Sequence, residues 1–306
     1  MNIAGRHAML AGGGDSPTPP AYWGIYFEAE EDNVVVSASI VSSRATVIYK
    51  STDGINWTEF VYDRNFTKRV KPETLASKGD RVYLRAASEY YGNNTTLSSI
   101  QFQLTGKVRA AGNIMSLFNA TDEENVTLPT SECCSGLFAG CSSLTSAPEL
   151  PATTLTTSCY YNMFKNCSSL AEAPALPSTT LANSCYSQMF YNCTSLASAP
   201  ELPATTLINY CYNNMFWGCS SLTSAPILPA TTLVSYCYSG MFNTCSNLST
   251  IEVGFTDWNA SGWSTNGWTD GVAANGTFTC PAALGTDSTI TRGISNCPSG
   301  WTVVNI

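Results

Sequence analysis

Cysteine is the residue type whose number and spacing could support chemistry in this chain. Ten of the 13 cysteines form five pairs, the members of a pair lie 8 positions apart, and each pair follows the previous one after 26 positions. The pairs are Cys133/Cys141, Cys159/Cys167, Cys185/Cys193, Cys211/Cys219 and Cys237/Cys245. Thiols can form disulfides, bind a metal ion or lie buried as small apolar side chains, so the spacing has to decide among three chemistries.

The spacing favours buried free thiols. A zinc site needs thiolates or histidines that converge, and a C-x7-C pattern repeated five times does not supply them. Because 13 is an odd number, the cysteines cannot all pair within one chain. In a stack of coils about 4.8 Å apart like residues form ladders, and although that spacing permits disulfides, we expect the paired columns to stay reduced. Cys280 and Cys297, outside the repeat, are the two that we expect to bond.

Glu149 and Glu201 are the second candidate for chemistry. They hold the same repeat position two coils apart, so strand spacing would separate them by roughly 9–10 Å, the long limit for an inverting glycosidase. Ala175 and Ile227 take that position in the other coils, and nothing distinguishes an acid from a base. The single histidine, His7, lies in the N-terminal tail, away from any folded triad. We therefore predict no enzyme, no cofactor and no metal, with a polysaccharide hydrolase as a minor alternative.

The fixed period of 26 residues predicts a stack of coils. Large apolar residues recur once per period, and such columns form a continuous core that no single coil could bury alone. The columns are Phe138, Phe164, Phe190, Phe216 and Phe242, and Leu144, Leu170, Leu196, Leu222 and Leu248. Because the recurring prolines disfavour helix, each coil should hold a short strand at Ser-Leu-Thr-Ser-Ala-Pro, an extended Ala-Thr-Thr-Leu segment and a short helical turn over Cys-Tyr-x-x-Met-Phe. We expect about five coils over residues 128–253, with altered first and last coils.

Other segments flank the coils. Residues 21–108 contain short β-branched runs between turns, which predict a small, Ig-like antiparallel β-sandwich. Within it, residues 51–57 (STDGINW) resemble the Asp-box hairpin of sialidases, which we interpret as a structural turn. Residues 109–127 should connect this domain to the coils, and residues 254–306, rich in tryptophan, should cap the last coil.

Residues 1–20 lack the apolar core of a secretory signal and contain glycine and proline, as a linker does. One interpretation is a disordered tail. The other is an anchor whose apolar residues Ile3, Met9 and Leu10 dock on another protein. We predict an anchor or linker at this end.

The repeat MFxxCSSLTSAPELPATTL resembles that of BspA-type leucine-rich-repeat proteins, whose units read roughly AFxxCSSLTSITIPxSVTSIG. Phe164, Cys167, Leu170, Pro177 and Leu181 fall on core positions of that repeat. Methionine replaces alanine before the phenylalanine, and Ala-Thr-Thr-Leu replaces the last segment. The layout also resembles surface proteins of gut anaerobes and of their phages. The resemblance implies a mainly β, leucine-rich-repeat-type solenoid displayed on a surface, as an adhesin or as a fibre or decoration protein, and it implies no catalytic residues.

Variable positions on the constant repeat indicate where a partner binds. Tyrosine, tryptophan and asparagine gather there, and these residues are typical of recognition surfaces. The candidate binding residues are Tyr161, Lys165, Tyr191, Tyr210, Trp217 and Tyr236. Neutral drift on a solvated face is the alternative. In contrast Tyr160, Tyr186, Tyr212 and Tyr238 recur in every coil and should form a stacked ladder that shapes the solenoid.

Composition and charge exclude other partners. A net charge of −8 with only 14 basic residues disfavours nucleic acid, and no apolar run reaches the ~18 residues of a membrane span. Because the chain shows no secretory signal, we predict a phage virion structural protein, of fibre or capsid-decoration type, located on the virion surface. A bacterial cell-surface adhesin is the alternative. The partners that we expect for the virion protein are other virion proteins, bound through residues 1–20, and a host-surface glycan or protein, bound through the coils. A homo-oligomer is left open.

Overall fold

The computed structural model describes residues 24–40, 47–64, 67–86, 97, 100–118, 124–258, 262–284 and 297–306. The predicted anchor, with Ile3, Met9 and Leu10, lies outside the described residues. The described part is mainly β, and its only helices are two short 3-10 turns.

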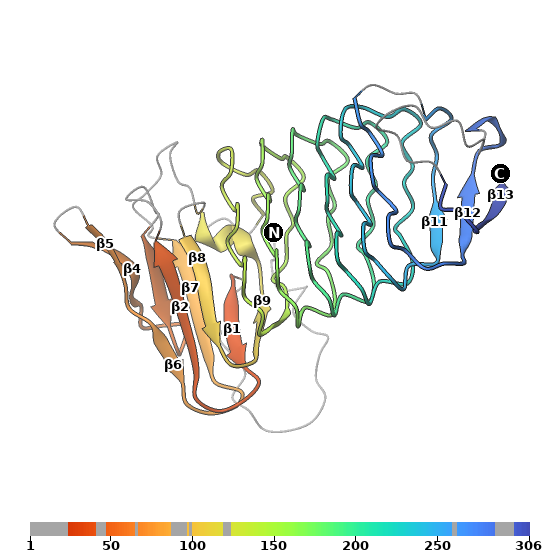
Figure 1. Ribbon diagram of the computed structural model, residues 1–306. Coiled ribbons are helices and arrows are strands. Elements are labelled where there is room, and N and C mark those ends of the chain that lie inside the picture. Colours follow the sequence, from red (N-terminus) through yellow and green to blue (C-terminus); the bar gives the residue numbers. More distant parts are fainter. Residues whose placement is uncertain are drawn as a thin grey trace, which may run out of the picture.

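Nine strands and one 3-10 helix precede the coils. They are β1 (Tyr26–Ala29), β2 (Val34–Ile40), β3 (Ile48–Ser51), β4 (Thr58–Arg64), β5 (Thr67–Val70), β6 (Glu73–Leu75), β7 (Arg81–Ala86), β8 (Ile100–Thr105), β9 (Val108–Ala111) and η1 (Ile114–Leu117). The elements that follow are β10 (Leu144–Ser146), β11 (Thr250–Glu252), β12 (Thr277–Cys280), η2 (Ala282–Leu284) and β13 (Thr302–Asn305). Figure 1 shows the strands at one end and the coils side by side beyond them.

The N-terminal strands form two sheets. One has the order β10-β9-β1-β7-β3-β4-β5 and the other β6-β2-β8. Strand β2 shows the alternation that a sheet facing a core requires, with Val34, Val36 and Ala38 buried. In an immunoglobulin sandwich the first two strands share a sheet, whereas here β1 pairs with β7 and β9, and β2 pairs with β6 and β8. The described strand order thus differs from the Ig-like order that we expected.

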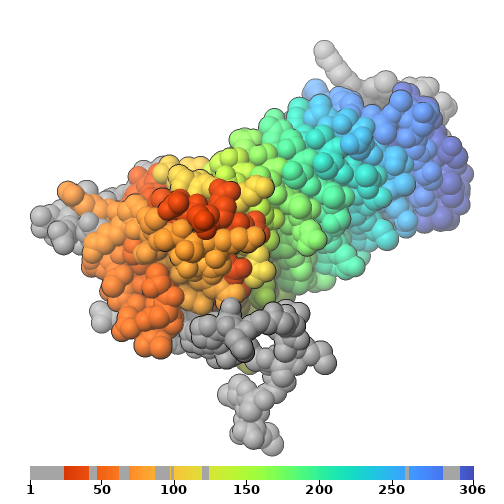
Figure 2. Space-filling view, turned by 90° about the horizontal axis from the view of Figure 1, so that it is seen from below, coloured from red at the N-terminus to blue at the C-terminus, as the bar shows by residue number. Residues whose placement is uncertain are grey.

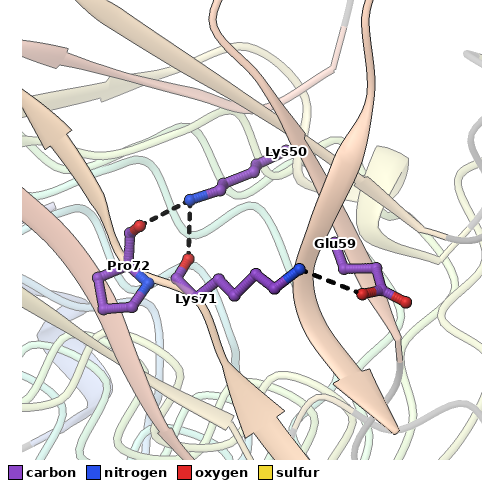
Figure 3. Close-up of polar contacts among 4 residues, drawn as sticks. All are labelled: Lys50, Glu59, Lys71 and Pro72. Atoms are coloured by element: carbon purple, nitrogen blue, oxygen red, sulfur yellow. Dashed lines mark hydrogen bonds and ion pairs between the residues drawn. The ribbon is translucent and has the colours of Figure 1, made fainter.

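A buried lysine ties the two sheets together. Lys50 on β3 is 8% exposed, and its Nζ donates to the carbonyl oxygens of Lys71 at 2.9 Å and Pro72 at 2.6 Å (Figure 3). The same ammonium lies 2.8 Å from the Glu73 carboxylate on β6. A buried charge is tolerated only when it is paired and hydrogen-bonded, and here its partners come from the segment that leads from one sheet to the other.

The Asp-box-like segment is a turn between β3 and β4. Asp53 Oδ1 accepts hydrogen bonds from the backbone N–H groups of Asn56 and Ile55 and from the Ser51 hydroxyl, at 2.7–2.8 Å. These donors, the Asn56 amide first, hold the pKa of the Asp53 carboxyl well below its usual range. All of these contacts serve the turn itself.

Each coil contains a run of turns over its Cys-Tyr-x-x-Met-Phe segment. Backbone N–H groups alternate between two kinds of partner there. The Tyr161 N–H donates within its own coil, to Ser158 O at 3.1 Å, whereas the Tyr160 N–H donates to Cys185 O of the next coil at 3.0 Å. This alternation couples every coil to its neighbour along the whole run.

The expected helical turn is absent because every fourth residue of this run has left-handed backbone. Ser158, Asn162 and Asn166 have φ of 54°, 57° and 63°, and the same positions are left-handed in the following coils. A right-handed helix cannot continue through such residues. The strand expected at Ser-Leu-Thr-Ser-Ala-Pro is also reduced: β10 and β11 are strands, but between them only single bridges such as Glu172↔Ser198 occur among the described residues.

Aromatic ladders fill the core of the stack. The phenylalanine column from Phe138 to Phe242 stacks with centroid distances of 5.3–5.9 Å. The tyrosine column from Tyr160 to Tyr238 stacks at 5.8–5.9 Å. Both ladders are buried; burial was predicted for the phenylalanine column and stacking for the tyrosine column.

The thiol columns lie beside these rings. All 13 cysteines are free and the ten of the repeat are buried. In the second column each thiol donates to the carbonyl of a phenylalanine in the preceding layer, for example Cys193 Sγ to Phe164 O of the preceding coil and Cys141 Sγ to Phe102 O of β8, both at 3.1 Å. Burial raises the pKa of the Cys185 and Cys245 thiols to about 12. Cys280 and Cys297, which we expected to bond, are both free thiols, and the Cys280 thiol at the end of β12 lies 3.7 Å from Asn305 Oδ1 on β13.

The strands and the coils share one core. Phe102 on β8 lies 5.1 Å from Phe27 and 5.2 Å from Phe138 of the first coil. Its backbone N–H donates to Leu137 O at 2.8 Å, as one coil donates to the next. Strand β9 crosses the boundary that we expected at residue 108 and pairs in parallel with β10. Figure 2 shows the strands and coils as one continuous body.

The stack also continues beyond residue 253. The Phe242 N–H donates to Trp268 O at 2.7 Å, where earlier coils donate to methionine. Strands β11, β12 and β13 pair in parallel, with Thr250 opposite Thr277 and Thr277 opposite Thr302. The described parts of residues 254–306, which we expected to cap the last coil, therefore form the same backbone hydrogen bonds as a further coil, although their sequence differs from that of the repeat.

Candidate binding face

Along each run of turns, two residues with buried side chains alternate with two residues whose side chains are directed outward. In one coil the buried residues are Cys211, Tyr212, Met215, Phe216 and Cys219, and the half-buried ones are Asn213, Asn214, Trp217 and Gly218. We call the surface formed by the outward side chains of residues 158–166, 184–192, 210–218 and 236–244 the turn face. All six predicted binding residues lie on it.

Four of the six join in one row of contacts. Lys165 Nζ donates to Gln188 Oε1 at 3.1 Å, and Gln188 Nε2 donates to the Tyr161 hydroxyl at 3.2 Å. The Lys165 ammonium also lies 4.7 Å from the centre of the Tyr191 ring. Tyr191 in turn stacks on Trp217 at 5.8 Å. Because these ring faces cover one another, this row offers ring edges and polar groups to a partner.

A glycine makes room for the tryptophan of that row. A Cβ at Gly240 would lie 3.0 Å from Trp217 Cε3 and would also meet Asn214 Oδ1. Other coils have Asn162, Gln188 and Asn214 at this position. The absent side chain therefore allows the Trp217 ring to lie against the backbone of the next coil.

Tyr210 and Tyr236 form a second group. Their rings stack in parallel with 4.6 Å between centroids and 6° between planes. Both residues have left-handed backbone, with φ of 60° and 55°, a conformation that bulky residues rarely adopt. Serine occupies the same position in two earlier coils, at Ser158 and Ser184.

Trp263 continues this second group, and our sequence analysis missed it. The Tyr238 N–H donates to Ser264 O at 2.9 Å, as Tyr160 donates to Cys185, so Ser264 takes the cysteine position and Trp263 the position of Tyr236. Its φ of 61° agrees with that register, and it is 44% exposed. The 27-residue step from Tyr236 hid the match, although GWSTNGWTDG still aligns with SYCYSGMFNT once that insertion is allowed.

The two glutamates weighed as a hydrolase pair do not share a cavity. A groove of 270 Å³ between two coils is lined by Pro200, Glu201, Pro203, Pro226 and Ile227, among others, and Glu149 is not part of it. Cleavage of a glycosidic bond needs two carboxyl groups around the scissile bond. Among the described residues no cluster of three His, Cys, Asp or Glu side chains could hold a metal ion.

A family model described as BspA type leucine rich repeat region matches residues 134–259 in six copies. These coils match BspA-type leucine-rich repeats. The match runs past residue 253, where we expected the coils to end, which agrees with the hydrogen bonding of the following segment. No curated protein and no solved structure matches the chain. Within the described ranges, no helix has the length and apolar character of a membrane span.

Proposed function

We propose that this protein is a non-enzymatic attachment protein whose coils form a leucine-rich-repeat solenoid and present the turn face to a glycan or protein on a cell surface. The observation that carries the proposal is the outward row of aromatic residues on an otherwise constant scaffold. Tyrosine and tryptophan provide large contact areas at low conformational cost, which is why they dominate recognition surfaces.

Backbone conformation supports selection of these residues over drift. At left-handed positions glycine and asparagine are the usual residues, and each coil has at least one of them at such a position. Tyr210 and Tyr236 stand at such positions, although a tyrosine there is strained by about 1–2 kcal/mol. Strained residues that persist often belong to functional sites.

The carrier is proposed to be a phage virion, with the protein as a fibre or capsid-decoration component anchored through residues 1–20. A bacterial cell surface would present the same turn face and is the alternative carrier. Surface display by BspA-type repeat proteins, together with the matched coils, supports both. Mass spectrometry and immunogold labelling of purified virions from the source decide between them, since an adhesin would label cells and be missing from virions.

Binding itself is tested with fluorescently labelled protein on candidate host cells. Replacing Tyr191, Trp217 and Tyr236 by serine should lower the apparent affinity by at least tenfold, because outward aromatic residues dominate binding energies. The matched control is Ile227→Ser, which removes a side chain 59% exposed and outside the turn face. Equal binding by the triple variant and the wild type would exclude the turn face as the attachment surface.

A further inference from the structure

Three aromatic residues follow one another at one position of successive coils. Tyr210, Tyr236 and Trp263, which we call the aromatic row, have φ of 60°, 55° and 61°. The three earlier coils have Glu132, Ser158 and Ser184 in the same left-handed conformation. The change from small or polar to aromatic is thus confined to the C-terminal half of the stack.

The rings at both ends of the row are exposed. Tyr210 and Tyr236 cover each other at 4.6 Å, so the free face of Tyr210 is the one directed toward the preceding coil. The residue there is Ser184, whose short side chain donates to Asn183 Oδ1 at 2.9 Å and cannot cover a ring. Tyr210 is 38% exposed and Trp263 is 44% exposed. The row therefore offers the free face of Tyr210 at one end and the exposed part of the Trp263 ring at the other.

The groups around the row are neutral or acidic. Between residues 124 and 258 the chain has seven acidic residues and one basic residue, Lys165. That ammonium is already engaged by Gln188 and by the Tyr191 ring. Asn183 and Asn209, which flank the row, are exposed and carry amides. A ligand with phosphate, sulfate or carboxylate groups would meet no free cation in these coils and would be repelled by the net charge.

We propose that the aromatic row binds a neutral glycan, a proposal that rests on the attachment function and names its ligand. The apolar C–H face of a hexopyranose packs on an aromatic ring, whose face is electron-rich, and its hydroxyls pair with amides and hydroxyls at the rim. From the Ser184 step to Trp263 there are three coil steps, roughly 14 Å at about 4.8 Å each. A glycan of about three sugars lying along the stack therefore reaches from the free face of Tyr210 to the Trp263 ring.

The ligand class is tested on host cells that bind the labelled protein. Cells are treated with periodate, which cleaves sugar diols, or with protease, and surface glycans are separated into neutral and acidic fractions by anion exchange. Periodate should abolish binding and protease should leave it intact. The neutral fraction should compete with the cells at least tenfold better than the acidic fraction at equal sugar concentration. Loss of binding after protease alone, or competition by the acidic fraction, overturns the proposal and leaves the attachment function standing.

The site is tested by Tyr210→Ser and Trp263→Ser, each measured against the neutral fraction by quenching of tryptophan fluorescence and by competition. Each variant should lose at least tenfold in affinity, while Ile227→Ser binds as the wild type does. Thermal unfolding followed by circular dichroism verifies that both variants are folded. Folded variants with unchanged affinity place the glycan elsewhere and overturn the aromatic row. If the wild type itself attaches to no cell, the attachment function fails instead.

Discussion

At the scale of single residues, the left-handed positions explain which side chains the turns accept. They occur at every fourth residue of each run, and most are glycine, asparagine or serine, because these residues tolerate that conformation. Tyr210, Gln188 and Thr244 are departures from this preference. Stability alone would not favour a tyrosine there, which makes its removal informative.

Tyr210→Asn should leave stability nearly unchanged and weaken attachment. Relief of the backbone strain, about 1–2 kcal/mol, offsets the loss of the stack on Tyr236, about 0.5–1.5 kcal/mol. The melting temperature should therefore move by only a few degrees. Tyr212→Asn is the control, since that neighbouring ring is 1% exposed and stacked in the core. If both variants melt equally early, Tyr210 is a structural residue and not a binding one.

The buried thiols should make the protein sensitive to alkali. The pKa of the Cys185 and Cys245 thiols rises from the ordinary 9.0 to about 12 on burial. The unfolded chain releases these protons above pH 9 and the folded chain does not, so the stabilisation is complete below pH 9 and is lost as the pH rises toward 12. One pH unit above 9, each such thiol should remove about 1.4 kcal/mol.

This loss is measured as the urea midpoint at pH 7, 9 and 10, which should fall a little up to pH 9, where the unfolded thiols are half ionised, and by more between pH 9 and 10. Iodoacetamide at pH 8 provides the second measurement, because it should label the ten repeat cysteines in urea but not in the native protein. Immediate labelling of the native protein, or a midpoint independent of pH, would show that the thiols are accessible.

At the scale of elements, each coil is stable only through its neighbours. Phe190 lies between Phe164 and Phe216, each 5.6 Å away. Phe190→Ala should lower the free energy of unfolding by about 3–5 kcal/mol, because it leaves a cavity in a stacked core. Tyr191→Ala, one residue along on the turn face, should cost only about 0.5–1.5 kcal/mol for its lost stacking. Chemical unfolding compares the two, and equal losses would contradict the division into core ladder and turn face.

The ladders were predictable from sequence because a period is a direct record of stacking. Phe164, Leu170 and Cys167 were placed in the core by their recurrence, and their burial confirms it. The prediction of a helical turn was wrong because the left-handed positions include tyrosine and glutamine, two residue types that do not indicate a turn in a sequence. Trp263 was missed because one inserted residue shifts its coil out of period. Lys50 was missed because its partners are backbone carbonyls, which a sequence does not show.

At the scale of the whole molecule, the N-terminal strands act as the first layer of the stack. The first coil receives hydrogen bonds from β8 and β9, including Val108 N–H to Ser143 O at 3.1 Å and Phe102 N–H to Leu137 O at 2.8 Å. A terminal coil needs such a cover, since its apolar face is otherwise exposed. The sheet that contains β1, β7 and β9 extends into the coils through β10. Strands and first coils should therefore unfold together.

Phe102→Ala tests this coupling in the full chain. Its ring contacts Phe27 in the strands and Phe138 in the first coil, so its loss should cost about 3–5 kcal/mol. Hydrogen exchange should accelerate by a similar factor in β7 and in residues 133–146, because one cooperative unit opens as a whole. Residues 211–222, three coils away, should be affected less, since repeat stacks couple mainly to nearest neighbours. Ile55→Ala, which removes a side chain 72% exposed on the β3–β4 turn, should change neither region. Faster exchange in β7 alone would mean that the coils are stable without the strands.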